Sequence, residues 1–285
     1  MSGPSVAVAR SVAELRRIVG GWRAAGERVG LVPTMGALHA GHIALVAAAR
    51  QSCRRVVVSI FVNPKQFGPR EDFSSYPRPE ADDLAKLAVA RADLAYIPAA
   101  GEMYPDGFAT TIGLTGAAEP LEGAHRPGHF DGVATVVCKL LTQVAPDEAF
   151  FGEKDYQQLL VVRRMARDLD LPVEIAGVPT VREADGLALS SRNVYLSAAE
   201  RRIAPELNRT LSQAAAAIAG GAAPMPVLAG AVEMLTRAGF QVEYVELRDA
   251  ATLTPVTGTP ERPARLLAAA HLGRTRLIDN VAVGS

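Results

Sequence analysis

L-V-P-T-M-G-A-L-H-A-G-H, residues 31–42, is the stretch that decides the fold. The apolar residues at its start predict a buried strand over residues 29–33, and the apolar residues that follow it predict a helix over residues 41–50. Its two glycines mark a turn between the strand and the helix. The stretch therefore predicts a strand–turn–helix unit, the local arrangement with which α/β proteins hold phosphate.

Two histidines, His39 and His42, stand where this predicted helix begins. The first N–H groups of a helix have no partner within the helix, and the helix dipole adds partial positive charge there. Residues three apart share one face of the first turn, so both imidazoles are expected to donate hydrogen bonds to phosphate oxygens. Gly41 lets a ligand approach the backbone closely. The simpler interpretation is a pair of surface or core histidines, and the nucleotide site is the interpretation we favour.

Strand and helix patterns alternate along the chain on both sides of this unit, up to about residue 180. Such alternation predicts an α/β fold with a doubly wound parallel sheet. Ser11 followed by Glu14 predicts a capping box at the start of the first helix. The remaining strands are predicted over residues 54–62, 93–98, 147–151 and 173–180, and the remaining helices over residues 11–25, 80–91, 132–144 and 155–168.

The pattern changes beyond residue 180. Two Ala-rich helices are predicted over residues 198–219 and 227–238, and three strands over residues 241–247, 265–271 and 275–280. Helices followed by a short sheet indicate a smaller α+β domain. We therefore predict two domains, residues 1–180 and residues 181–285.

Composition excludes several classes of protein. The 285 residues carry 30 basic and 30 acidic side chains, and no block of like charge occurs, which argues against a nucleic acid or an anionic membrane as partner. Cys53 and Cys138 lack the spacing of a disulfide framework or a Cys-rich zinc site. Residues 1–10 contain no signal-peptide run, and no apolar stretch is long enough to span a membrane. We expect a cytoplasmic protein.

Further segments of the sequence indicate which ligand the predicted site binds. No G-x-G-x-x-G follows the first predicted strand and no Gly-Lys pair occurs, which argues against a dinucleotide dehydrogenase and a Walker A loop. The segments F-V-N-P-K-Q-F (61–67) and G-E-K-D-Y-Q-Q (152–158) each follow a strand, at the sheet edge where ligands bind. E-G-A-H-R-P-G-H-F-D-G (122–132) concentrates ionisable groups, and L-S-S-R-N (189–193) lies just beyond the domain boundary.

Together these motifs resemble the pantothenate synthetase (pantoate–β-alanine ligase) family of the H-x-G-H nucleotidyl-transferase superfamily. The matching segments run in order from about residue 32 to residue 196, and include P-T-M-G-A-L-H-A-G-H, R-P-G-H-F-D-G-V, F-F-G-E-K-D-Y-Q-Q and S-S-R-N-x-Y-L. The resemblance implies a Rossmann-like domain, a smaller C-terminal domain that closes over it as a lid, and a homodimer. It also implies a reaction. ATP and (R)-pantoate form pantoyl adenylate and pyrophosphate, and β-alanine then gives pantothenate and AMP.

The resemblance also implies roles for individual residues. His42 is the family's proton donor, and His39, Lys154 and Arg192 complete the catalytic set that contacts the phosphates. The remaining ATP-binding residues are expected to be Met35, Gly152, Glu153, Asp155, Val181, Leu189, Ser190 and Ser191. Pantoate is expected to be bound by Gln66, Gln158, Asn63, Arg126 and His129.

Several of these roles have local alternatives. Asp155 can be a helix N-cap only, His129 a structural histidine, and either glutamine an ordinary surface residue. Mg²⁺ is expected with the triphosphate, and Asp82 and Asp83 are candidate partners for it, one of them serving only as a solvated helix residue. The metal ligands stay unassigned.

Two other functions are weighed beside the ligase. The first is another H-x-G-H nucleotidyl transferase with nicotinate mononucleotide or phosphocholine as acceptor, which does not explain the segments at residues 61–67 and 152–158 together. The second is a non-catalytic nucleotide-binding protein, against which the intact His39, His42, Lys154 and Arg192 argue.

Overall fold

The computed structural model describes residues 5–69 and 71–284. The first four residues of the segment predicted to lack a signal peptide lie outside this range. Two compact units make up the chain. Unit 1 runs up to Glu153 and continues over Gln158–Pro179, whereas unit 2 begins at Thr180 and also includes Lys154–Gln157. A four-residue segment in the middle of the chain therefore belongs to the C-terminal unit.

Unit 1 is built on a parallel sheet, which confirms the predicted Rossmann-like α/β fold. Chain order reverses between two adjacent strands, β2 (Val29–Thr34) and β5 (Glu148–Gly152), which pair at Gly30 and Glu148. Ligands bind at such a reversal. Strand β1 was not predicted. The spatial order is β1 (Ala7–Ala9), β4 (Leu94–Tyr96), β3 (Arg55–Ile60), β2, β5 and β6 (Glu174–Val178).

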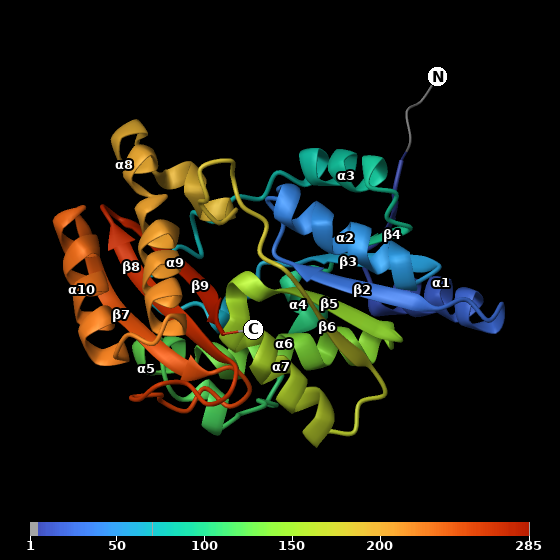
Figure 1. Cartoon of the computed structure of the whole chain (residues 1–285). Coiled ribbons are helices and arrows are strands. Elements are labelled where there is room, and N and C mark those ends of the chain that lie inside the picture. Colours follow the sequence, from blue (N-terminus) through green and yellow to red (C-terminus); the bar gives the residue numbers. More distant parts are fainter. Residues whose placement is uncertain (1–4, 70, 285) are drawn as a thin grey trace. The chain divides into compact units, whose positions relative to one another are not determined.

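Helices cover both faces of this sheet (Figure 1). Alternate residues of β2 point to opposite faces, so Leu31 joins the core formed with α1 (Val12–Ala24), α6 (His129–Val144) and α7 (Tyr156–Asp168). Val32 joins a second core with α2 (Ala40–Ser52) and α3 (Glu80–Val89). The predicted capping box of Ser11 and Glu14 is present at α1. The short helices α4 (Ala100–Met103) and α5 (Glu122–His125) lie in the connections.

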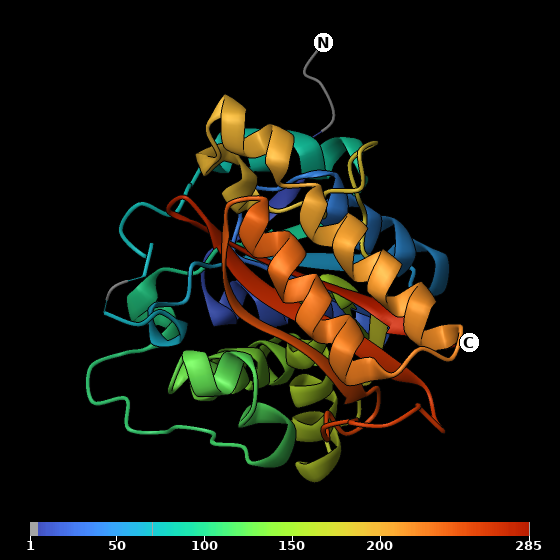
Figure 2. The same cartoon turned by 60° about the vertical axis from the view of Figure 1, so that its left-hand side comes forward.

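Unit 2 has the predicted α+β character. An antiparallel sheet of β7 (Phe240–Asp249), β8 (Ala264–Leu272) and β9 (Thr275–Val283) packs against α9 (Glu206–Ala219) and α10 (Pro224–Arg237), which Figure 2 shows side by side.

The single helix predicted over residues 198–219 is wrong. The chain forms α8 (Ala198–Ile203) and α9, and the break falls at Pro205. Proline lacks the N–H of a helical hydrogen bond, and its ring clashes with the preceding turn.

Both cysteines are free thiols, as their spacing predicts. Within residues 5–69 and 71–284, no helix combines the length and the apolar character needed to cross a bilayer.

Candidate active site

The two histidines of the H-x-G-H motif form the N-terminal cap of α2. His39 is the N-cap, with an extended backbone, and its Nδ1 accepts the Gly41 N–H at 3.1 Å. His42 forms the reciprocal bond, because its Nδ1 accepts the His39 N–H at 3.2 Å. The ring centroids are 4.0 Å apart. His39 therefore precedes the first turn instead of lying on it, and the motif is a capping box made of two imidazoles.

This cap sets the tautomer of both rings. A nitrogen that accepts a hydrogen bond carries no proton, so each neutral ring bears its hydrogen on Nε2. Both histidines thus keep an Nε2–H donor while Nδ1 satisfies a backbone N–H that would otherwise lack a partner in the helix. The capping function and the donor function use different atoms of the same side chain.

Helix α3 holds the loop that leads into this cap. Buried Asp83 accepts the N–H of Ala37 at 2.9 Å and that of Leu38 at 2.7 Å, while Lys86 Nζ donates to the Leu38 carbonyl at 2.7 Å. The loop needs such support because Ala37 has a left-handed backbone with a φ of 50°. Burial raises the pKa of Asp83, and the two backbone donors partly oppose this rise.

Asp83 therefore has a different role from the one the sequence suggested. Its two oxygens accept backbone N–H groups, and its side chain is nearly inaccessible to solvent, which does not fit a ligand of Mg²⁺ on a bound nucleotide. Asp82 is exposed on the same helix. In the part of the chain that the structure describes, no cluster of three or more His, Cys, Asp or Glu side chains has the arrangement of a metal site.

Two residues predicted to bind pantoate, Asn63 and Gln66, meet Met35, which is predicted to bind ATP, beside the end of β3. Asn63 Nδ2 donates to Gln66 Oε1 at 3.1 Å and to the Gly132 carbonyl at 3.1 Å, and Gln66 Nε2 lies 3.3 Å from Met35 Sδ. Asn63 Oδ1 in turn accepts the hydroxyl of Tyr104 at 2.7 Å. The Gln66 amide is therefore oriented from two sides, and Met35 connects it to the loop that follows β2.

Arg126 and His129 hold the backbone of the same glutamine. His129 Nδ1 donates to the Gln66 carbonyl at 2.9 Å, and its Nε2 accepts from Arg126 Nη1 at 3.1 Å. Arg126 forms a bidentate ion pair with Glu71 at 2.9 and 2.6 Å and contacts Glu122 at 3.4 Å. Glu71 was missed by the sequence analysis, because its partner lies 55 residues away and no spacing pattern connects them.

Protonation of His129 is opposed by its surroundings. Burial, together with the charge of Arg126, lowers the pKa of His129 from 6.5 to about 4. The unfolded chain takes up this proton near pH 6.5 and the native protein only near pH 4, so we expect the free energy of unfolding to fall as pH decreases through this window. This difference in the pKa of His129 between the unfolded and the native protein corresponds to a loss on the order of 3 kcal/mol in the free energy of unfolding.

Urea unfolding at several pH values measures this loss. The variant His129→Gln, whose amide can both donate and accept, is expected to show a flatter dependence between pH 6.5 and 4 than the unsubstituted protein. An equally steep dependence in the variant would assign the acid sensitivity to other groups.

The other predicted ATP-binding residues lie in unit 2, except Gly152 and Glu153, which belong to unit 1. Val181 and Leu189 are joined because the Leu189 N–H donates to the Val181 carbonyl at 3.0 Å. Ser190 caps a short 3-10 helix, η4 (Ser191–Tyr195), by accepting the Arg192 N–H at 3.3 Å. Lys154 lies in η3 (Glu153–Asp155), directly before α7, and its Nζ is 3.8 Å from the Asp155 carboxylate. Gly152 ends β5, and Gln158 is half-buried in the first turn of α7.

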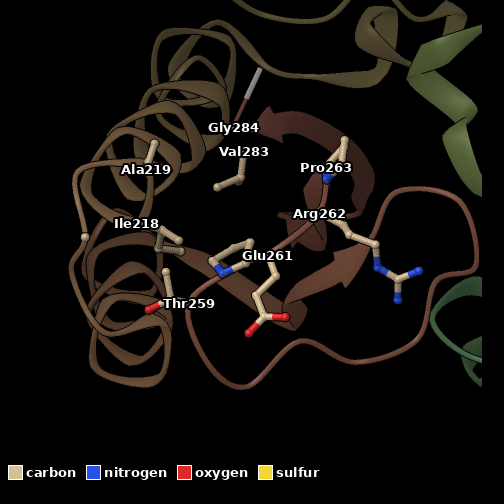
Figure 3. Close-up of a pocket in the computed structure, with 10 residues that line it drawn as sticks. Ile218, Ala219, Thr259, Glu261, Arg262, Pro263, Val283 and Gly284 are labelled. Atoms are coloured by element: carbon tan, nitrogen blue, oxygen red, sulfur yellow. The ribbon is translucent and has the colours of Figure 1, made fainter.

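A cavity of about 260 Å³ in unit 2 lies elsewhere. Figure 3 shows it lined by Ile218 and Ala219 at the end of α9, by the loop that carries Glu261 and Arg262, and by Val283 of β9. None of the predicted site residues lines this cavity, and the one cationic side chain in its wall, Arg262, is accompanied by the carboxylate of Glu261, which disfavours a triphosphate. We do not assign the nucleotide to it.

Comparison with known proteins places this geometry in context. A family model described as pantoate-beta-alanine ligase matches residues 7–282, beyond the last recognised motif and through most of unit 2. The pantothenate synthetase of Rhodospirillum rubrum is 59% identical over 277 residues, which cover 97% of this chain and 98% of that protein. That of Caulobacter vibrioides is 57% identical over 280 residues, with 97% and 98% covered.

Two solved structures are also similar. The pantothenate synthetase of Thermus thermophilus superimposes with a TM-score of 0.92 at 49% identity, covering 98% of this chain and all of that one. The pantoate-beta-alanine ligase of Francisella tularensis, solved with beta-gamma ATP and beta-alanine, gives a TM-score of 0.84 at 33% identity and covers 97% of each chain.

Proposed function

The chain belongs to the pantoate-beta-alanine ligase family, and from this premise we propose how its residues carry out the ATP-dependent ligation of pantoate and β-alanine. The observation that carries the proposal is the pair of imidazoles at the start of α2. In both rings Nδ1 accepts a backbone N–H of the cap, so Nε2–H is the donor atom of each ring, at a helix N-terminus next to the reversal of strand order. Oriented hydrogen-bond donors and a helix dipole suit a triphosphate.

In the first step, an oxygen of the pantoate carboxylate attacks the α-phosphorus of ATP, and the bond from that phosphorus to the β-phosphate oxygen breaks. Negative charge develops on the transferred phosphoryl group and on the departing pyrophosphate. We assign His39 and His42 to stabilise this charge by hydrogen bonds, Lys154 as a point charge, and Arg192 as a fork that can bind two phosphate oxygens. We also assign Gly152, Glu153, Asp155, Val181, Leu189, Ser190 and Ser191 to bind ATP.

In the second step, the neutral amine of β-alanine attacks the acyl carbon of pantoyl adenylate and AMP leaves. The amides of Gln66 and Gln158 are assigned to pantoate, because an amide both donates to a carboxylate and accepts from a hydroxyl. The bonds from Asn63 and to Met35 support this assignment for Gln66, since they hold its amide in one orientation. Arg126 and His129 hold the backbone of Gln66 by donating hydrogen bonds to its carbonyl oxygen.

Mg²⁺ is proposed as a partner of the triphosphate. The residues described here provide no protein cage for it, and Asp83 is engaged with backbone N–H groups. Because Mg²⁺ prefers phosphate oxygens and water over many protein ligands, the triphosphate itself is proposed to hold the ion. No step is assigned to the ion.

Three further properties are proposed with the activity. Unit 2, which carries Arg192, is proposed to act as a lid that excludes water from the hydrolysable adenylate. The family resemblance supports a homodimer, which analytical ultracentrifugation measures directly. Consumption of ATP and the two free thiols support a cytoplasmic protein, which fractionation of cells tests.

The test of the function is pantoate-dependent exchange of pyrophosphate into ATP. We expect exchange with pantoate in the absence of β-alanine, and AMP release when β-alanine is added. The lid proposal requires that Arg192→Ala weakens ATP binding and slows exchange. Exchange supported by nicotinate mononucleotide or phosphocholine but not by pantoate would identify another transferase, and no AMP with all substrates would identify a binding protein.

A further inference from the structure

Lys154 is held by unit 2 although it follows a strand of unit 1. The segment Lys154–Gln157 groups with unit 2, whereas the residues on either side of it in the chain belong to unit 1. The last strand of the chain provides the contact, because Asn280 Nδ2 of β9 donates to the Lys154 carbonyl at 2.9 Å. Nothing in the sequence motifs gives a role to this strand, which begins well beyond the last of them.

Asn280 is itself fixed in place. Only 5% of it is exposed, and its Oδ1 accepts from Arg265 Nη1 at 2.6 Å. The Arg265 guanidinium lies 3.8 Å over the ring of Tyr156, whose hydroxyl donates to the Ala250 carbonyl at 2.8 Å. The Lys154 segment is thus held at two points, the Lys154 carbonyl and the Tyr156 side chain, which lie on either side of Asp155 in the chain.

The neighbouring residue on β9 holds the other ATP-binding segment. Asp279 is 4% exposed and forms a bidentate ion pair with Arg182 at 2.7 and 2.9 Å. Arg182 follows Val181 and forms an isolated antiparallel β-bridge with Ala188. The ion pair therefore anchors the hairpin of residues 181–189 (the Val181–Leu189 hairpin), which leads to Ser190. The Asn280 N–H also donates to Asp279 Oδ1 at 2.7 Å, which couples the two anchors.

We propose that Asp279 and Asn280 are positioning residues for ATP: they hold the Lys154 segment and the Val181–Leu189 hairpin in one fixed relation within unit 2. This inference rests on the proposed function in one respect: it assumes that these two segments bind ATP. Buried networks in which the polar groups are paired rigidify a site, and a loss of about 1 Å in position is costly to catalysis. Unit 2 accordingly does more than carry Arg192, because it also sets the position of Lys154.

The variant Asn280→Asp tests the contact with Lys154. Aspartate keeps the acceptor for Arg265 but replaces the amide donor with an oxygen that faces the Lys154 carbonyl. We expect the Kd for a non-hydrolysable ATP analogue to rise about tenfold, with the KM for pantoate changed by less than about twofold. Glu243→Gln is the matched control, since it removes one charge from an ion pair with Arg276 in the same sheet and is expected to leave the ATP Kd within about twofold.

A double variant separates positioning from loss of stability. If Asn280 acts through Lys154, then Asn280→Asp adds less than about twofold to the ATP Kd in a Lys154→Ala background. If Asn280→Asp does not fold, Asn280→Ser is used instead. It is expected to raise the ATP Kd by the same factor alone and by less than about twofold in the Lys154→Ala background.

An unchanged ATP Kd in the folded single variant, or a full tenfold effect in the Lys154→Ala background, overturns the inference. Exchange activity of the unsubstituted protein decides the proposed function separately.

Discussion

Replacing His42 with alanine is expected to slow pantoate-dependent ATP–pyrophosphate exchange by about 10²- to 10³-fold, the usual cost of losing one well-placed hydrogen-bond donor to a transition state. The reason lies in the tautomer. His42 Nδ1 accepts the His39 N–H, so Nε2–H is the donor through which we propose that the ring contacts the phosphates. Steady-state exchange at saturating ATP and pantoate measures the effect.

His39 offers a matched comparison that separates the two functions of the cap. His39→Ser keeps an N-cap oxygen for the helix but removes the imidazole donor, whereas His39→Ala removes both. Both variants are expected to lose exchange activity. Only His39→Ala is expected to lose stability, by about 1 kcal/mol. Full exchange activity in His39→Ser would show that the ring contributes only the cap.

Replacing Gly132 with alanine is expected both to disrupt the proposed pantoate site and to destabilise unit 1. A Cβ at this position of α6 would lie 2.1 Å from the Lys65 carbonyl oxygen and 2.7 Å from the Gln66 nitrogen, so helix and loop must separate. We expect a loss of about 1–3 kcal/mol in the free energy of unfolding. Displacement of Gln66 by about 1 Å is expected to slow pantoate-dependent exchange by about 10²-fold.

Gly230 is the control for this substitution. It also lies inside a helix, α10, but no atom lies within 4 Å of the Cβ it would acquire. Gly230→Ala is therefore expected to stabilise the protein by about 0.5–1 kcal/mol and to leave exchange unchanged. Chemical unfolding and exchange assays on the two variants measure both effects. Pantoate-dependent exchange at the unsubstituted rate in Gly132→Ala would contradict the proposed link between α6 and Gln66.

Local patterns account for what the sequence predicted correctly. The longer strands and helices of unit 1, the Ser11–Glu14 cap and the start of α2 at the H-x-G-H motif depend on neighbours within a few residues, which periodicity and capping rules detect. The break at Pro205 was also locally encoded, and the Ala-rich pattern on either side of it masked the signal.

By itself, the sequence determined the fold class, the position of the H-x-G-H cap and the family. The tertiary structure alone decided which groups support the site. Asp83 meets the loop before α2 across 45 residues, Glu71 meets Arg126 across 55, and Asn280 meets Lys154 across 126. Such pairs have no fixed spacing, because the sheet and its connections bring them together only when the chain has folded. The motif around Lys154 therefore predicts the chemistry of its side chain, whereas the last strand of the chain, through Asn280, holds its backbone in position.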